Sequence, residues 1–125
     1  MFELTVEIPF CAAHEIKGHP GPCAQLHGHN YRALITVSGE RLNQAGMLVD
    51  FGDLKDLSAL VVASLDHAYL NALPAFADIN PTAEAIARHI YRGVAAELAS
   101  RSDLPLVLAR VTVYESERSF ATYQE

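Results

Sequence analysis

Three histidines and one cysteine in the first quarter of the chain have the types and spacing of a metal site with a neighbouring base. His27 and His29 are two residues apart in the run Cys23-Ala24-Gln25-Leu26-His27-Gly28-His29-Asn30-Tyr31. Residues two apart on a β-strand point to the same face, so one ion could lie between the two rings. His14 would supply a third imidazole from a different strand. Three nitrogen ligands leave a zinc ion one open position, which is typical of catalytic zinc sites.

The residues alone leave the role of this cluster open. Cys23 could be a fourth zinc ligand, which would close the site and make it structural. Alternatively, zinc and imidazoles favour the thiolate form, so that Cys23 would serve as a base or nucleophile. A histidine pair at a strand end can also simply donate hydrogen bonds, and many cysteines are inert buried residues. We assign Cys11 to this inert class, and His19 and His89 to the protein surface.

Four further residues carry groups that suit acid–base chemistry or substrate binding. Asp66 can orient His67 as a proton shuttle, although a histidine at a helix C-terminus often only stabilises the last carbonyls. Glu115 ends an apolar strand row, where an unpaired carboxylate needs a donor partner. That partner is either an internal arginine or lysine, or a ligand that presents an N–H/NH₂ pair. Thr82 could add a hydroxyl to a site, or only cap a helix.

The composition disfavours several classes of function. The chain has 125 residues, 50% of them hydrophobic, a mean hydropathy of +0.12 and a net charge of −6. This length predicts a single domain over residues 1–125 that buries a core without disulfides. The acidic charge disfavours nucleic acid or a membrane as a partner, and no apolar stretch has the length of a membrane span. Because residues 1–4 also lack signal-peptide character, we expect a cytoplasmic protein with free thiols.

Hydrophobic alternation predicts five strands. Three are long, at about 2–10, 27–38 and 107–114, and two are short, at 46–51 and 119–123. The strand at 27–38 carries on one face His27, His29, Tyr31, Ala33, Ile35 and Val37. The strand at 107–114 carries on one face Val107, Ala109, Val111 and Val113.

Two helices are expected between the third and fourth strands. The first would bury the stripe Leu54, Leu57, Leu60, Val61 and Leu65. The second would start with Asn80 as its cap and Pro81 in its first turn, and would bury Ala83, Ile86, Ala87, Ile90, Val94 and Leu98. The order β-β-β-α-α-β-β predicts an α+β fold, an antiparallel sheet with both helices on one face. Its two open edges, together with the apolar composition, favour pairing with other subunits.

Short motifs follow one another in a fixed order along the whole chain. They are Phe10-Cys11-Ala12-Ala13-His14, the run from Cys23 to Tyr31, Val49-Asp50-Phe51, Leu65-Asp66-His67, Leu70-Asn71, Asn80-Pro81-Thr82-Ala83-Glu84 and Val113-Tyr114-Glu115. Together they resemble the 6-pyruvoyltetrahydropterin synthase family. The short gap between Cys23 and His27 resembles the bacterial branch that makes 6-carboxytetrahydropterin for queuosine, because the tetrahydrobiopterin-making enzymes usually have a longer gap.

The resemblance implies a fold, an assembly and a metal. The fold is the tunnelling fold, in which the sheets of three subunits close a barrel and two trimers stack into a homohexamer. Zinc would be held by His14, His27 and His29, and Cys23 would be a catalytic base instead of a ligand.

The resemblance also implies roles for the remaining candidates. Asp66 and His67 correspond to a proton-relay pair, which could serve the Cys23 of a neighbouring subunit. Glu115 corresponds to the carboxylate that grips the amino-pyrimidine edge of a pterin, and Thr82 is a second candidate for substrate binding. We therefore expect a zinc lyase that acts on 7,8-dihydroneopterin triphosphate. The alternatives are triphosphate elimination alone, as in 6-pyruvoyltetrahydropterin synthase, or a non-catalytic module that binds zinc or pterin.

Overall fold

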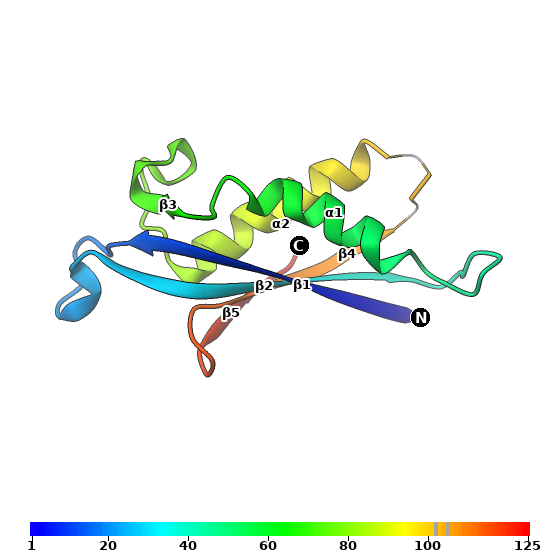
Figure 1. Ribbon diagram of the computed structural model, residues 1–125, viewed down its shortest axis with the longest axis horizontal. Helices are drawn as coiled ribbons and strands as arrows, with labels where there is room; N and C mark the ends of the chain where they lie inside the picture. Colours follow the sequence, from blue (N-terminus) through cyan, green and yellow to red (C-terminus); the bar gives the residue numbers. More distant parts are fainter. Residues whose placement is uncertain (102, 105) are drawn as a thin grey trace.

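A long antiparallel hairpin forms the centre of the computed structural model, which describes residues 1–101, 103–104 and 106–125. Strand β1 (Phe2–His14) pairs with strand β2 (His27–Gly39) along its whole length. The pairing begins with Phe2 opposite Gly39 and ends with His14 opposite His27 (Figure 1). The hairpin therefore brings two of the expected metal ligands to the same end of the sheet.

The described residues form one five-stranded sheet with the strand order β3-β1-β2-β4-β5. Strands β4 (Val107–Tyr114) and β5 (Phe120–Tyr123) continue it on the β2 side. On the other edge, β3 (Ala68–Tyr69) runs parallel to the end of β1. Helices α1 (Phe51–Val62) and α2 (Ala83–Ala99) both lie on one face of the sheet (Figure 1). The predicted α+β class is confirmed, and 3-10 turns complete the chain at η1 (Pro22–Ala24), η2 (Leu70–Ala72) and η3 (Pro74–Phe76).

The two faces of the hairpin differ in character. The helix-covered face is buried and carries Val6, Phe10, Ala12, Tyr31, Ala33, Ile35 and Val37, as the alternation predicts. The opposite face carries cross-strand polar pairs, which are Glu3–Arg110, Thr5–Thr36, Glu7–Arg32 and Thr112–Thr122. Such pairs stabilise a sheet face that packs against no helix.

The strand predicted at 46–51 is wrong. This segment forms turns, and Asp50 caps α1 by accepting hydrogen bonds from the amides of Gly52 and Asp53. A short apolar segment can form either a strand or the start of a helix, and here the Asp50 cap favours the helix. In α1, Leu60 is exposed, contrary to the predicted stripe, whereas the neighbouring Ser58 is fully buried.

Two further predictions need correction. Thr82, and not Asn80, is the N-cap of α2, since its hydroxyl accepts a hydrogen bond from the Ala85 amide. In β4, the pairing register shifts opposite Thr36 and Val37, so Leu108 is buried and Val107 is exposed. One extra residue in a strand moves the side chains beyond it to the opposite face of the sheet. Strict alternation along the sequence does not predict such a shift. Pro105, which the sequence places before this strand, lies outside the described residues.

Helix α2 packs its apolar stripe against the sheet. The α2 stripe is buried as predicted at Ile86, Ala87, Ile90, Val94 and Leu98, whereas Ala83 is partly exposed. Within the described residues, no helix is both long and apolar enough to cross a membrane. The packing of the two helices on the sheet therefore fixes the positions of the ends of β1, β2 and β4.

Candidate metal centre and active site

Three imidazole rings converge where the hairpin ends. His14 closes β1, His27 opens β2, and His29 follows on the same face of β2. One ring nitrogen from each histidine lies within 4.8 Å of the other two. The rings stand nearly edge-on to one another, with centroids 4.5–5.2 Å apart. The predicted ligand set is thus brought together by strand alternation and by the register of one hairpin.

Backbone carbonyls orient two of these rings. His14 Nδ1 lies 2.7 Å from Pro81 O, and His27 Nδ1 lies 2.6 Å from Gln25 O. A neutral imidazole that donates from Nδ1 keeps a lone pair on Nε2, as in metal-ligating histidines. The two Nε2 atoms then face each other at 2.9 Å. Two lone pairs at this distance repel, and a cation bound by both nitrogens would convert the repulsion into attraction.

His29 completes the set with a nitrogen that needs a partner. Its Nε2 is buried and makes no hydrogen bond within the described residues. Burial lowers the pKa of His29, the charges of His14 and His27 lower it further, and Glu115 opposes the shift. The ring is therefore neutral near pH 7, which is the form that binds a metal. An orphaned buried nitrogen beside two convergent ones fits a divalent cation such as zinc.

Tyr31 supports the cluster from the core side. Its hydroxyl lies 3.3 Å from His14 Nδ1, and its ring stacks on Phe10 with centroids 4.9 Å apart. Burial and the charge of Glu115 raise its pKa, so the phenol stays protonated. The sequence pattern places Tyr31 in the core row but gives no sign of this contact with the metal ligands.

Glu115 faces the same three rings from the end of β4. Its carboxylate oxygens lie 3.7 Å from His29 Nε2 and 4.0 Å from His14 Nε2. Among the described residues, no arginine or lysine forms an ion pair with Glu115, so the internal cationic partner considered above is not found. A third of the side chain remains exposed. The carboxylate is therefore free to accept a ligand's donors while it contributes negative charge beside the metal centre.

Cys23 and Thr82 line one hollow with Glu115. This hollow has a volume of about 290 Å³ and is bounded by η1, the start of α2 and the turn into β5. Cys23 is exposed, and its sulfur is not one of the ligand atoms that converge within the described residues. Thr82 caps α2, so its hydroxyl also has the structural role that the sequence left open. Cys23 therefore stands outside the convergent ligand set and shares a hollow with Glu115.

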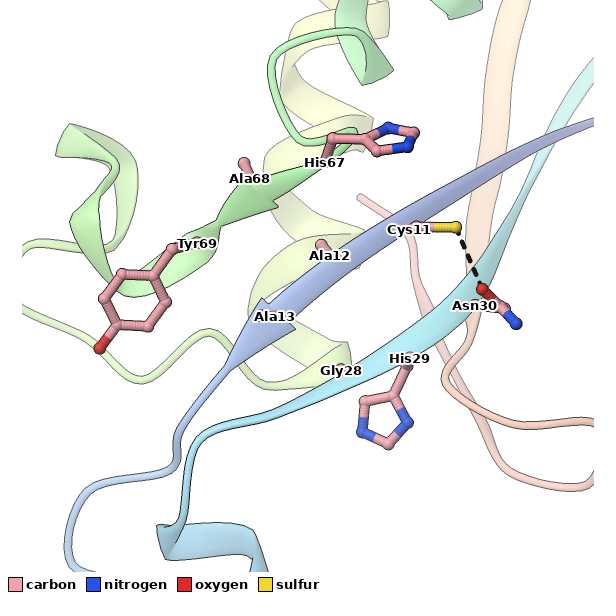
Figure 2. A pocket seen from close by; sticks show the side chains of 9 residues that line it. All are labelled: Cys11, Ala12, Ala13, Gly28, His29, Asn30, His67, Ala68 and Tyr69. Atoms are coloured by element: carbon pink, nitrogen blue, oxygen red, sulfur yellow. Dashed lines mark hydrogen bonds between the residues drawn. The ribbon is translucent and has the colours of Figure 1, made fainter.

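His67 lines a second hollow of about 460 Å³, which residues of β1, β2 and β3 surround and which His29 also lines (Figure 2). Asp66 Oδ1 lies 2.9 Å from His67 Nδ1 and accepts a hydrogen bond from the Cys11 amide at 3.0 Å. The Cys11 bond, aided by His67, lowers the pKa of Asp66. His67 has a φ of 57°, in the left-handed region that few residues other than glycine adopt, and its ring nitrogen lies close to the adjacent carboxylate. A carboxylate so placed can orient an imidazole for proton transfer.

The whole chain matches known proteins closely enough to show its family. Residues 3–125 match the family model described as 6-pyruvoyl tetrahydropterin synthase. The chain belongs to this family. This 6-pyruvoyl tetrahydropterin synthase family member shares 30% identity with a Haemophilus influenzae protein named 6-carboxy-5,6,7,8-tetrahydropterin synthase, over 100% of both chains. A Bacillus subtilis protein of that name is 36% identical over 98% of this chain and 85% of its own.

A solved structure of the same family has the same fold. The Caenorhabditis elegans 6-pyruvoyl tetrahydropterin synthase superimposes with a TM-score of 0.83 and 26% identity, covering 100% of this chain and 97% of that one. The family resemblance inferred from the motifs is therefore confirmed, as is the fold class.

Two side chains of this family member differ from their sequence-based assignment. Cys11 is exposed at the second hollow instead of buried, and its thiol donates to Asn30 Oδ1 at 3.0 Å (Figure 2). His89 is half-buried against Phe76, and burial lowers its pKa, so it is not a surface residue. His19 is exposed, as expected, and lines the Cys23 hollow.

Proposed function

We propose that the chain is a zinc-dependent lyase that converts 7,8-dihydroneopterin triphosphate into 6-carboxy-5,6,7,8-tetrahydropterin, acetaldehyde and triphosphate, within queuosine biosynthesis. The bacterial relatives named for this product support the proposal. The observation that carries it is the convergence of three imidazoles on Glu115, which also lines the hollow that holds Cys23. Cytoplasmic location stays a prediction from the sequence.

In this proposal, His14, His27 and His29 hold the zinc ion. When bound, zinc would polarise the oxygens of the substrate side chain and make the adjacent C–H and O–H groups more acidic. The Pro81 and Gln25 carbonyls orient the rings of His14 and His27, so these two ligands need little rearrangement to bind metal.

Cys23 and Glu115 would act on the substrate from the same hollow. The Glu115 carboxylate accepts the paired N–H donors of the pterin ring, which places the substrate side chain toward the histidines. The Cys23 thiolate removes a proton from that side chain. Positioned acid–base groups of this kind contribute about 10²- to 10⁴-fold each. Thr82 lies at the edge of the hollow and adds a hydroxyl contact.

Asp66 and His67 would complete the site from a neighbouring subunit. In one chain His67 lines a different hollow from Cys23, so we expect the relay to join residues of two copies. The sheet offers edges for such pairing: β3 covers only Ala12 and Ala13 of the β1 edge, and β5 forms the opposite edge. We propose a homo-oligomer, a trimer or hexamer, in which these edges meet and the polar sheet face lines a barrel.

The second candidate function is the 6-pyruvoyl tetrahydropterin synthase reaction, which the name of the nematode structure favours. Both reactions begin from the same substrate with the same groups. Incubation of the zinc-loaded protein with 7,8-dihydroneopterin triphosphate separates them by product. We expect equal amounts of acetaldehyde and 6-carboxytetrahydropterin. A 6-pyruvoyl product without acetaldehyde would establish the second candidate, and unchanged substrate would leave a binding module.

Mixed oligomers test whether the site lies between subunits. Cys23→Ala and His67→Ala should each be inactive alone, because each lacks one side of the relay. Unfolded together and refolded as mixed oligomers, they should regain about a quarter of wild-type turnover, since random pairing joins the intact Cys23 and His67 at that share of sites. No recovery in oligomers shown to contain both chains would place the relay within one subunit.

A further inference from the structure

Two asparagine side chains from distant elements hold the segment that follows β1. Asn71, in η2, accepts a hydrogen bond from the Glu15 amide and donates one to Glu15 O, both at 2.9 Å. Asn80, just before α2, makes the same two bonds with Lys17, at 2.9 and 2.8 Å. Each side-chain amide binds both backbone polar groups of one residue, as a paired residue on a neighbouring strand would.

The residue between these two clamped positions connects them to Cys23. The Ile16 amide donates to Cys23 O at 2.9 Å. Successive residues of an extended segment direct their backbone groups to opposite edges. One edge of residues 15–17 is therefore held by the two asparagines, and the other edge holds the backbone of Cys23. The turn that carries the proposed base is fastened through Ile16 to η2 and to the start of α2.

The same elements fix a metal ligand. His14 directly precedes Glu15, and its Nδ1 bonds the carbonyl of Pro81, the residue after Asn80. Pro81 thus bonds His14 before Glu15, and Asn80 bonds Lys17 after it. Displacement of this segment would alter the distance between His14 and Cys23, the two groups that must act on one substrate.

We propose that Asn71 and Asn80 are positioning residues of the active site, whose amides set the placement of Cys23 relative to His14. The catalytic consequence rests on the function proposed above. The structural consequence, a fastened Cys23 turn, stands independently of it. Neither asparagine lines the Cys23 hollow, so each acts through the segment it holds.

Asn43 provides a matched control. Its side-chain oxygen also accepts two backbone hydrogen bonds, from Ala45 and Met47 at 2.9 and 3.0 Å. These partners are two and four residues away in its own turn, whereas the partners of Asn71 and Asn80 are 56 and 63 residues away. Asn43→Ala therefore loses two side-chain-to-backbone hydrogen bonds without loosening residues 15–17, whereas Asn43→Asp keeps both accepted bonds and controls for the added charge.

The test compares Asn71→Asp, Asn80→Asp and Asn43→Asp in the zinc-loaded protein. Aspartate keeps the accepting oxygen but replaces the NH₂ donor with an oxygen that repels the Glu15 or Lys17 carbonyl. Alanine variants at the same positions exclude an effect of the added charge. Amide exchange at Ile16 reports the bond to Cys23 O without any need for turnover. Steady-state kinetics then separate kcat from KM.

We expect Ile16 exchange to rise by about tenfold or more in both clamp variants and to stay at the wild-type rate in Asn43→Asp. We expect kcat to fall by about a hundredfold with KM changed by less than about threefold, because a displaced base slows chemistry more than binding. Unchanged exchange at Ile16 would overturn the clamp. Faster exchange with wild-type kcat would overturn the positioning role. If the wild-type protein turns over no pterin triphosphate, the proposed function fails, and Ile16 exchange alone decides the clamp.

Discussion

His14 is buried in the fold and is also a proposed metal ligand, so its replacement should destabilise the protein even without metal. Its side chain is 1% exposed, and its Nδ1 bonds Pro81 O at 2.7 Å. His14→Ala removes that bond, leaves the carbonyl unpaired and opens a cavity beneath the β1–β2 hairpin. These losses predict a decrease of about 2–4 kcal/mol in the free energy of unfolding. His27 is only half-buried, so His27→Ala should cost about 1 kcal/mol or less.

The comparison uses urea unfolding in a chelator, followed by circular dichroism at one protein concentration, because subunit association adds to apparent stability. Zinc binding is measured separately by competition with a chromophoric chelator. Both variants should lose tight zinc binding, since each removes one of three ligands. Equal stability losses in His14→Ala and His27→Ala would refute the structural role of His14, and tight zinc binding by either variant would refute the ligand set.

Three further predictions follow from single contacts. Gly93→Ala should lower the free energy of unfolding, measured by urea denaturation, by about 1–3 kcal/mol. An added Cβ would lie 2.5 Å from Val61 Cγ1, where α1 packs against α2. Wild-type stability would mean that the Val61 side chain or the helices shift at little cost. The pKa of Asp66, followed by NMR, should lie below the ordinary aspartate value because of the Cys11 amide bond, and an ordinary value would exclude that bond. Glu115→Gln should raise KM for the pterin about tenfold or more while the zinc content stays unchanged, since an amide cannot accept a donor pair bidentately. An unchanged KM would show that Glu115 does not bind the substrate.

Local periodicity predicts most of the hairpin and the histidine cluster. Alternation alone places His27 and His29 on the face that continues into the core row, and the register of the hairpin then sets His14 opposite His27. The same alternation, followed strictly, puts Cys11 on the face of Glu3 and Glu7, where the structure has it exposed. The sequence-based assignment of Cys11 followed the usual burial of cysteine, and the pattern was the better guide.

The remaining errors arise where a contact is made outside the local pattern. The Asp50 cap, the register shift in β4 and the half-burial of His89 against Phe76 each depend on geometry that a single segment does not encode. The two asparagine clamps span more than fifty residues of chain, so spacing gives no sign of them. The orientation of His67 toward Asp66 likewise depends on a left-handed backbone conformation.

Cys23→Ala distinguishes a catalytic base from a metal ligand at this site. The variant should bind zinc with wild-type stoichiometry and affinity, because within the described residues the convergent nitrogens of His14, His27 and His29 form a ligand set without the Cys23 sulfur. Its turnover of 7,8-dihydroneopterin triphosphate should fall by about 10²- to 10⁴-fold, the usual contribution of a positioned base. Loss of zinc from Cys23→Ala would make the cysteine a ligand and would contradict the proposed mechanism.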